Sequence, residues 1–366
     1  MHILISLLIF GVIVMVHEWG HFYVARKNGI FVEEFAIGMG PLLLSKTDKI
    51  GTLYSIRLLP IGGYCKMLGE DGEKKSKDDA DHLQPLPPEE GSYQSKHVFA
   101  RMSVILAGSV MNFILSFVLV LVVVSMNGFA SLTVETVSPD SPAALVGLQP
   151  GDQITHIAGR RLFVFADAPS AIASVGQNPL TMVVNRAGQR LTLTDIVPDI
   201  GPGGNYIIGF TSVFYAGLGG HDDRPTPHVF QVITQSFNTT LYYTRLIAYG
   251  LFQLVTFNVS MNDMAGPLGI IGMVGDTYQA AATISQRAVA TQMINLAALL
   301  SANLGLFNLL PIPALDGGRM VFLTIEAIRG KPIDQEKEGM VHLAGFVLLM
   351  GLIVVVFFND IANLFR

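Results

Sequence analysis

Residues 13–22 read IVMVHEWGHF, an apolar run into which two histidines and a glutamate are inserted before the run ends. The surrounding residues 3–24 are long enough to cross about 30 Å of hydrocarbon as one helix. Ionisable side chains inside a membrane span are unfavourable, and where they occur they usually mark a functional site. The stretch therefore predicts a first transmembrane helix with a functional site within it.

The composition of the whole chain is that of a membrane protein. Of its 366 residues, 51% are hydrophobic and 14% are charged, whereas soluble domains average about 25% charged residues. Three further apolar stretches have spanning length and predict helices at residues 102–126, 291–313 and 341–358. The net charge is −5 and no basic tract stands out, so no nucleic acid is expected as a partner. The pattern predicts a polytopic α-helical protein that lies in a lipid bilayer.

The distribution of lysine and arginine predicts how the four spans are oriented. Loops rich in these residues close to the span ends stay in the cytoplasm. Residues 25–101 contain eleven of them, and residues 128–238 contain five. We therefore expect both termini outside the cytoplasm, the loop at 69–98 inside it, and residues 128–238 outside.

One further segment, residues 238–257 (NTTLYYTRLIAYGLFQLVTF), is nearly long enough to cross. If it crossed, the third span would run in the opposite direction and the basic residues at 319–337 would lie outside. Arg245 and the threonines of the segment favour an amphipathic helix in the membrane interface instead. We expect this helix to lie on the outer leaflet or to dip into it.

The sequence HEWGH places His17, Glu18 and His21 in an H-E-x-x-H pattern. Residues four apart on a helix share a face, so the two histidines can bind one Zn²⁺ while Glu18 takes a proton from the metal-bound water. The same pattern arises by chance, and histidines can also be hydrogen-bonded within a helical bundle. Its position inside a span favours the metal site.

A catalytic zinc takes three protein ligands and keeps a fourth position open. The predicted third ligand is Asp316, in the stretch SANLGLFNLLPIPALDGGR at residues 301–319, because the third span should end near the depth of the two histidines. An Asp followed by Gly commonly serves as a turn or helix cap instead. The HExxH motif on the same side of the membrane favours the ligand.

A third polar insertion, AGSVMNF at residues 107–113, lies in the cytoplasmic half of the second span. Gly108 permits close approach of another helix, and Asn112 offers an amide to a neighbour. Helix packing alone explains both residues, so this insertion is the weakest of the three signals.

HEWGH in the first span and NLLPIPALDGGR near the end of the third resemble the motifs of the bacterial site-2 protease family, specifically its RseP-like zinc intramembrane metalloproteases. The similarity covers nearly the whole chain, and the two motifs together are highly specific. The resemblance implies zinc held by His17, His21 and Asp316, with Glu18 as the general base. It also implies a bacterial plasma membrane, with the active site toward the cytoplasmic side.

The resemblance extends to three asparagines. It implies that Asn303 and Asn308 help to hold the substrate or the intermediate. Asn112 matches the family pattern A-G-P-x-x-N, but the chain departs from that pattern at Ser109, where relatives commonly have proline. The departure puts the local helix geometry in doubt and leaves the chemistry unchanged.

Short β-like runs punctuated by glycines occupy residues 31–67. They predict either a cytoplasmic hairpin or, as the resemblance implies, a re-entrant β-sheet at membrane depth whose edge can pair with an unwound substrate. The charged and Pro-rich residues that follow, up to the second span, predict a mobile loop.

Residues 130–200 resemble a PDZ domain, an α+β fold, through the stretch VETVSPDSPAALVGLQPGDQITHIAGRRL. Ile154 and Ile157 are predicted core residues, and Ala187-Gly188 is a predicted hairpin turn. PDZ domains accept an extended peptide at a sheet edge. This extracytoplasmic domain could therefore bind the exposed terminus of a substrate, or act as a gate that excludes bulky ectodomains.

These predictions divide the chain into four parts: the first half of the membrane core at 1–127, the PDZ domain at 130–200, a post-PDZ region at 201–285, and the second half of the core at 286–366, which contains the LDGG motif at 315–318. The leading hypothesis is a zinc endopeptidase that cleaves single-span membrane proteins, either anti-sigma-type regulators or signal-peptide remnants. An alternative is a PDZ-bearing membrane scaffold with a non-catalytic metal site. Structural zinc sites usually close with four ligands, and three ligands plus Glu18 favour catalysis. A metal transporter is a third hypothesis, but the internal repeats frequent in transporters are not found in the sequence.

Overall fold

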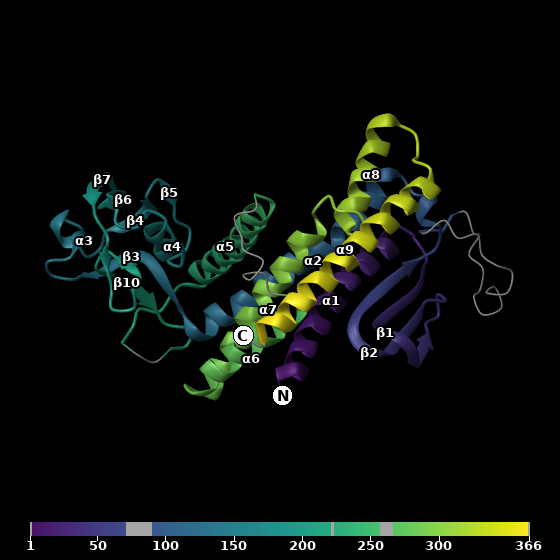
Figure 1. Cartoon of the computed structure of the whole chain (residues 1–366), viewed down its shortest axis with the longest axis horizontal. Helices are drawn as coiled ribbons and strands as arrows, with labels where there is room; N and C mark the ends of the chain where they lie inside the picture. Colours follow the sequence, from purple (N-terminus) through teal and green to yellow (C-terminus); the bar gives the residue numbers. More distant parts are fainter. Residues whose placement is uncertain (1, 71–89, 221–222, 257–265, 365–366) are drawn as a thin grey trace. The chain divides into compact units, whose positions relative to one another are not determined.

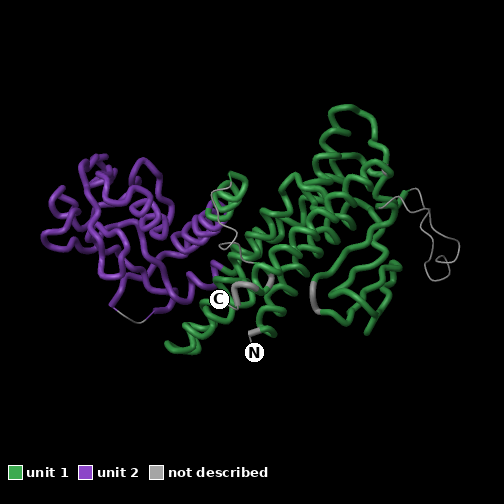
Figure 2. Tube along the Cα trace, in the orientation of Figure 1, with its two compact units in different colours: residues 1–119, 246–366 green, residues 120–245 purple. Residues whose placement is uncertain are grey.

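The computed structural model describes residues 2–70, 90–220, 223–256 and 266–364 (Figure 1). The chain forms two compact units: residues 1–119 with 246–366, and residues 120–245 (Figure 2). Most of the predicted loop at 69–98 lies outside the described residues, and its described end contains a short 3₁₀ helix, η2 (Tyr93–Ser95). Each unit has its own hydrophobic core.

Four helices within the described residues are long and apolar enough to cross a membrane: α1 (His2–Lys27), α2 (Val98–Asn127), α7 (Gln286–Asn308) and α9 (Gln335–Leu364). The four predicted spans are therefore confirmed as helices. Helix α1 ends where Gly29 adopts φ +69°, and the Ile30 N–H then donates to the Ala25 carbonyl at 2.9 Å. A glycine in this conformation is the common way to terminate a helix.

The third span lies five residues earlier in the sequence than predicted, at 286–308 instead of 291–313. It was expected to continue to residue 313, but α7 ends at Asn308 and a separate helix, α8 (Asp316–Arg329), follows a tight turn. Pro311 and Pro313 have no backbone N–H to donate, and each disfavours helical backbone in the residue before it. The two prolines thus place Asp316 in the first turn of its own helix.

Two helices connect the PDZ-like domain to the third span, α5 (Val229–Val255) and α6 (Pro267–Ala282). Helix α5 begins earlier than the predicted segment 238–257 and exposes an apolar stripe that includes Phe230, Phe237 and Phe252. Helix α6 was not predicted. Its first turn is capped from α9, because the Asp360 carboxylate accepts the N–H groups of residues 266, 268 and 269 at 3.0–3.1 Å.

A β-sheet lies along α1, formed by β1 (Val32–Thr47) and β2 (Leu53–Met67) (Figure 1). Residues 32–37 pair with two parts of β2, 53–56 on one side and 63–67 on the other, so the long hairpin folds back on itself. The fold-back requires Gly38, which adopts φ +86° and where a Cβ would stand 2.5 Å from the Leu59 carbonyl oxygen. Large apolar side chains at residues 42–44 and 58–59 are exposed.

The second unit contains the PDZ-like domain. Its main sheet has the order β10-β3-β4-β6-β7, with β5 beside β4 and a separate β8-β9 pair. The strands are β3 (Phe129–Val137), β4 (Gln153–Ile157), β5 (Arg160–Arg161), β6 (Leu180–Arg186), β7 (Gln189–Ile196), β8 (Asp199–Ile200), β9 (Tyr206–Ile207) and β10 (Phe210–Tyr215), and the helices are α3 (Pro142–Leu145) and α4 (Asp167–Ala173). Because β10 pairs with β3, the domain extends beyond the predicted boundary at residue 200.

The predicted core and hairpin of this domain are present. Ile154 and Ile157 are 2% and 0% exposed and belong to its core. Ala187 and Gly188 both adopt positive φ between β6 and β7, the backbone of a type I′ turn that matches the twist of a hairpin. Both features agree with the predictions made from the resemblance to a PDZ domain.

Candidate active site

Helix α1 supplies two imidazoles and a carboxylate. His17 and His21 are 5% and 6% exposed, and their Nε2 atoms lie 3.2 Å apart. Glu18, the residue after His17, lines a cavity together with the two histidines. One helical face therefore presents the three groups together, as the four-residue spacing predicts.

Helix α8 brings Asp316 to the two histidines. Its Oδ2 lies 3.1 Å from Nε2 of His17 and 3.3 Å from Nε2 of His21. The two glycines that follow allow this approach, since a Cβ on Gly317 would stand 2.1 Å from the Leu310 carbonyl oxygen and one on Gly318 would stand 2.5 Å from that of Ile312. The DGG sequence thus combines a ligand with a helix start packed directly against the preceding turn.

The three donor atoms fit a zinc ion. Tetrahedral zinc with ligand bonds of about 2.0–2.1 Å holds its donors about 3.3–3.4 Å apart, and the three separations here are 3.1, 3.2 and 3.3 Å. Oδ2 of Asp316 is buried and has no conventional hydrogen-bond donor among the described residues. A metal bound by these three atoms would satisfy that oxygen and leave one coordination position for a water or substrate.

The other imidazole nitrogens are held by α2. His21 Nδ1 lies 2.9 Å from the Val104 carbonyl oxygen, so Nδ1 carries the proton and the Nε2 lone pair is free for a metal. The side-chain amide of Asn112 lies 3.2 Å from His17 Nδ1. An amide can present either its oxygen or its nitrogen, and zinc binding through Nε2 of His17 requires the oxygen. Asn112 is therefore an orienting group for His17.

Gly108 of α2 packs directly on the ligands. A Cβ at this position would stand 2.5 Å from His21 Nε2 and 2.6 Å from His17 Cε1. Helix packing alone, the reason predicted from the sequence, does not fully explain Gly108, because this glycine also leaves space for the metal ligands. Ser109, where the family pattern commonly has proline, is fully buried within α2. The helix continues through this position, so the departure from the pattern leaves it intact.

The two asparagines of α7 differ in position. Asn308 lines the cavity, and its amide nitrogen lies 3.4 Å from Nε2 of His17. Asn303 is not among the residues that line this cavity. Its Oδ1 is buried without a hydrogen-bond partner in the described part of the chain. Asn308 therefore lies at the site, whereas Asn303 does not line its cavity.

The cavity has a volume of about 440 Å³ and includes residues that the sequence did not indicate: Tyr64, Cys65, Glu70 and Arg319. Cys65 and Glu18 line the same cavity. Burial and a hydrogen bond to Glu34 raise the pKa of Tyr64 to about 12. Tyr64 and Cys65 come from the end of β2, Glu70 follows that strand, and Arg319 lies in α8 directly after the LDGG motif.

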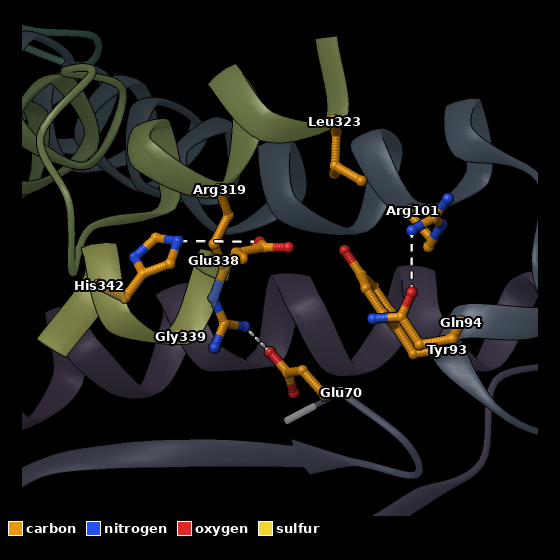
Figure 3. Close-up of a pocket in the computed structure, with 9 residues that line it drawn as sticks. All are labelled: Glu70, Tyr93, Gln94, Arg101, Arg319, Leu323, Glu338, Gly339 and His342. Atoms are coloured by element: carbon orange, nitrogen blue, oxygen red, sulfur yellow. Dashed lines mark hydrogen bonds and ion pairs between the residues drawn. The ribbon is translucent and has the colours of Figure 1, made fainter. Parts of the chain in front are cut away.

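A second cavity of about 270 Å³ adjoins the first and shares Glu70 and Arg319 with it (Figure 3). These two side chains form an ion pair. Ionisable side chains from α2 and α9 also line it, among them Arg101, Glu338 and His342. The metal-ligand site is therefore bordered by a polar chamber.

The chain is similar to known proteins along nearly its whole length. Residues 5–352 match the model of peptidase family M50. A Clostridium perfringens protein named as a zinc metalloprotease is 38% identical over 99% of this chain and 98% of its own length. The zinc metalloprotease RasP of Bacillus licheniformis is 34% identical over 98% of each chain, and that of Geobacillus kaustophilus is 31% identical over 98% of this chain and 97% of its own. Among solved structures, the PDZ domain of the SdrC-like protein Lmo2051 from Listeria monocytogenes is 24% identical, covers 23% of this chain and 90% of that domain, and gives a TM-score of 0.21.

Proposed function

This chain belongs to peptidase family M50 and is a zinc metalloprotease of the site-2 type, and from this premise we propose that it hydrolyses peptide bonds of single-span membrane proteins within or close to the bilayer. The observation that carries the proposal is the cluster of His17, His21 and Asp316 beside Glu18, in a cavity between transmembrane helices. His17, His21 and Asp316 would hold the zinc.

Glu18 is the proposed general base. Zinc, when bound at such a site, acts as a Lewis acid that lowers the pKa of its water to about 7. The Glu18 carboxylate takes a proton from the attacking water and delivers it to the nitrogen of the leaving amine. Asn112 orients His17, and Asn308 is placed to contact the substrate at the scissile bond.

The sheet beside α1 is the proposed substrate-binding element. A helical substrate must unwind before hydrolysis, because its carbonyl groups are engaged in the helix. Residues 63–67 have one pairing strand among the described residues, and Tyr64 and Cys65 in this stretch line the cavity. An unwound substrate that adds as a strand to this edge would pass beside Glu18. The sheet would thereby hold the extended segment in reach of the base.

The proposed orientation follows the lysine and arginine distribution. It places both termini and the PDZ-like domain outside the cytoplasm of a bacterial plasma membrane, and the zinc site toward the cytoplasmic side. Anti-sigma-type regulators and signal-peptide remnants are the proposed substrates. The PDZ-like domain either binds a substrate terminus or acts as a size gate.

Substitution of Glu18 tests the proposal against the alternative of a membrane scaffold with a non-catalytic metal site. The purified full chain is incubated with a panel of single-span substrates, with and without a chelator, and zinc content is measured in parallel. Glu18→Gln should abolish cleavage and leave zinc content near normal, because Glu18 is a base and not a ligand. Glu90→Gln, at an exposed position, is the matched control. Undiminished cleavage by Glu18→Gln would remove Glu18 from the mechanism, and absence of chelator-sensitive cleavage by the unmodified chain would favour the scaffold.

A further inference from the structure

The turn that precedes Asp316 has an unfavourable backbone conformation. Ala314 adopts φ +77°, in the left-handed region that residues with a Cβ rarely occupy. Such a residue keeps its conformation only when the surrounding structure holds it there. Two residues later the chain supplies the proposed third zinc ligand, so the conformation of Ala314 decides where Asp316 points.

Helix α9 holds this turn at two points. Nδ1 of His342 accepts the Ala314 N–H at 2.9 Å. Gly345, three residues further along α9, packs against Pro313, where a Cβ would stand 2.3 Å from the Pro313 Cβ and 2.9 Å from its carbonyl carbon and oxygen. Neighbouring positions on one face of α9 thus supply an acceptor and a space, both directed at the turn.

The environment of the His342 ring fits an acceptor role. Because Nδ1 accepts from a backbone N–H, a neutral ring carries its proton on Nε2. Nε2 faces the second cavity, 3.8 Å from the nearer Glu338 carboxylate oxygen (Figure 3). The ring also packs against Phe322 of α8, with a centroid separation of 5.5 Å. His342 therefore contacts both the turn before Asp316 and the helix that follows it.

We propose that His342 is a positioning residue of the zinc site, which holds Ala314 in the left-handed conformation that directs Asp316 toward His17 and His21. Gly345 supplies the close approach that this hydrogen bond requires. The proposal rests on the proposed zinc ligands. It assigns a function in metal binding to a helix that carries no ligand of its own.

Two substitutions separate the acceptor from the bulk of the ring. His342→Phe keeps an aromatic ring against Phe322 but removes the acceptor, whereas His342→Asn places an amide oxygen close to the position of Nδ1. Loss of an outer partner of a metal ligand typically reduces metal affinity about 10- to 100-fold. We expect His342→Phe to weaken zinc binding by that amount and His342→Asn to restore most of it.

Zinc affinity is measured on the detergent-purified full chain by competition with a chelator, and the absorption spectrum of the Co²⁺-substituted chain reports the ligand geometry. Neither measurement needs a substrate, so failure of the positioning proposal is distinguishable from failure of the protease proposal. In a cleavage assay, His342→Phe should lower kcat more than it changes KM. His228→Phe, at an exposed histidine, is the control.

Gly345→Ala provides an independent test, since it alters the contact with Pro313 without removing a polar group. Weakened zinc binding by both His342→Phe and Gly345→Ala, with recovery in His342→Asn, is the expected result. The proposal is overturned if His342→Phe binds zinc as tightly as the unmodified chain, or if Phe and Asn at this position weaken binding equally. It is overturned as well if Gly345→Ala leaves zinc affinity and the Co²⁺ spectrum unchanged.

Discussion

Addition of one methyl group at Gly108 should disrupt the zinc site without touching a ligand. In Gly108→Ala the new Cβ would stand 2.5 Å from His21 Nε2 and 2.6 Å from His17 Cε1, and ordinary contact begins at 3.4 Å. The imidazoles and α2 must therefore separate by about 0.9 Å. Distances at a functional zinc site stay within about 0.2 Å of their usual values. The required displacement is several times larger than that tolerance.

The fold should survive this change more readily than the site. Overpacking of a well-packed interior typically costs about 1–3 kcal/mol, and the four apolar spans remain intact. We expect Gly108→Ala to be inserted and purified as a folded chain that loses zinc affinity by at least about 10-fold, the lower end of the effect of outer substitutions. Chelator competition measures the affinity, and circular dichroism with chromatography measures the folding.

Gly351→Ala is the matched control for this experiment. Gly351 lies in α9, another predicted span, and a Cβ there meets no atom within 4 Å among the described residues. It should bind zinc and cleave substrate as the unmodified chain does. If Gly108→Ala bound zinc as tightly as Gly351→Ala, the close contact between α2 and the two imidazoles would not constrain the site, and our account of Gly108 would be refuted.

Three further predictions concern the third ligand, the PDZ-like domain and the orientation. Asp316→Asn should weaken zinc retention, because an amide carries no charge to neutralise the metal, and an unchanged metal content would reject Asp316 as a ligand. Asp152→Asn should destabilise the PDZ-like domain by about 1–3 kcal/mol. The reason is that Arg186 donates two hydrogen bonds of 2.7 Å to the buried Asp152 carboxylate. These bonds also lower the pKa of Asp152. A lowered pKa stabilises the folded domain at pH values above the pKa of the unfolded chain, near 3.9, and this stability is lost as the pH falls through the pKa of the folded domain. The difference in hydrogen exchange between the variant and the unmodified domain should therefore shrink below about pH 4. A difference that does not change with pH would contradict the ion pair. Single cysteines introduced near residues 90 and 330 should be labelled from the cytoplasm, and one near 180 should be labelled from outside. The buried Cys65 should give only a low background. Labelling of position 330 from outside would mean that the segment 238–257 spans the membrane.

Much of the architecture could be predicted because it depends on local patterns. Twenty or so consecutive apolar residues predict a spanning helix whatever its neighbours are, and all four predicted spans are helices. The Ala187-Gly188 turn likewise predicted the hairpin between β6 and β7, because a hairpin turn depends on a few neighbouring residues. The local errors, at the end of α7 and at α6, occur where prolines and a distant cap compete with the apolar pattern. Asp360 caps α6 from more than 90 residues away, and no local signal could indicate that.

The sequence by itself determined which groups of α1 share a face, since a spacing of four residues on a helix places His17 and His21 together with Glu18 beside them. It also predicted Asp316, from its motif and from the depth at which the third span was expected to end. Only the tertiary structure decided that Gly108 makes room for the imidazoles, that Asn308 reaches the ligands from a position 291 residues away along the chain, and that His342 holds the turn before Asp316. The physical reason is range: a helix fixes the relations among its own residues through its periodicity, whereas contacts between helices depend on how whole surfaces pack.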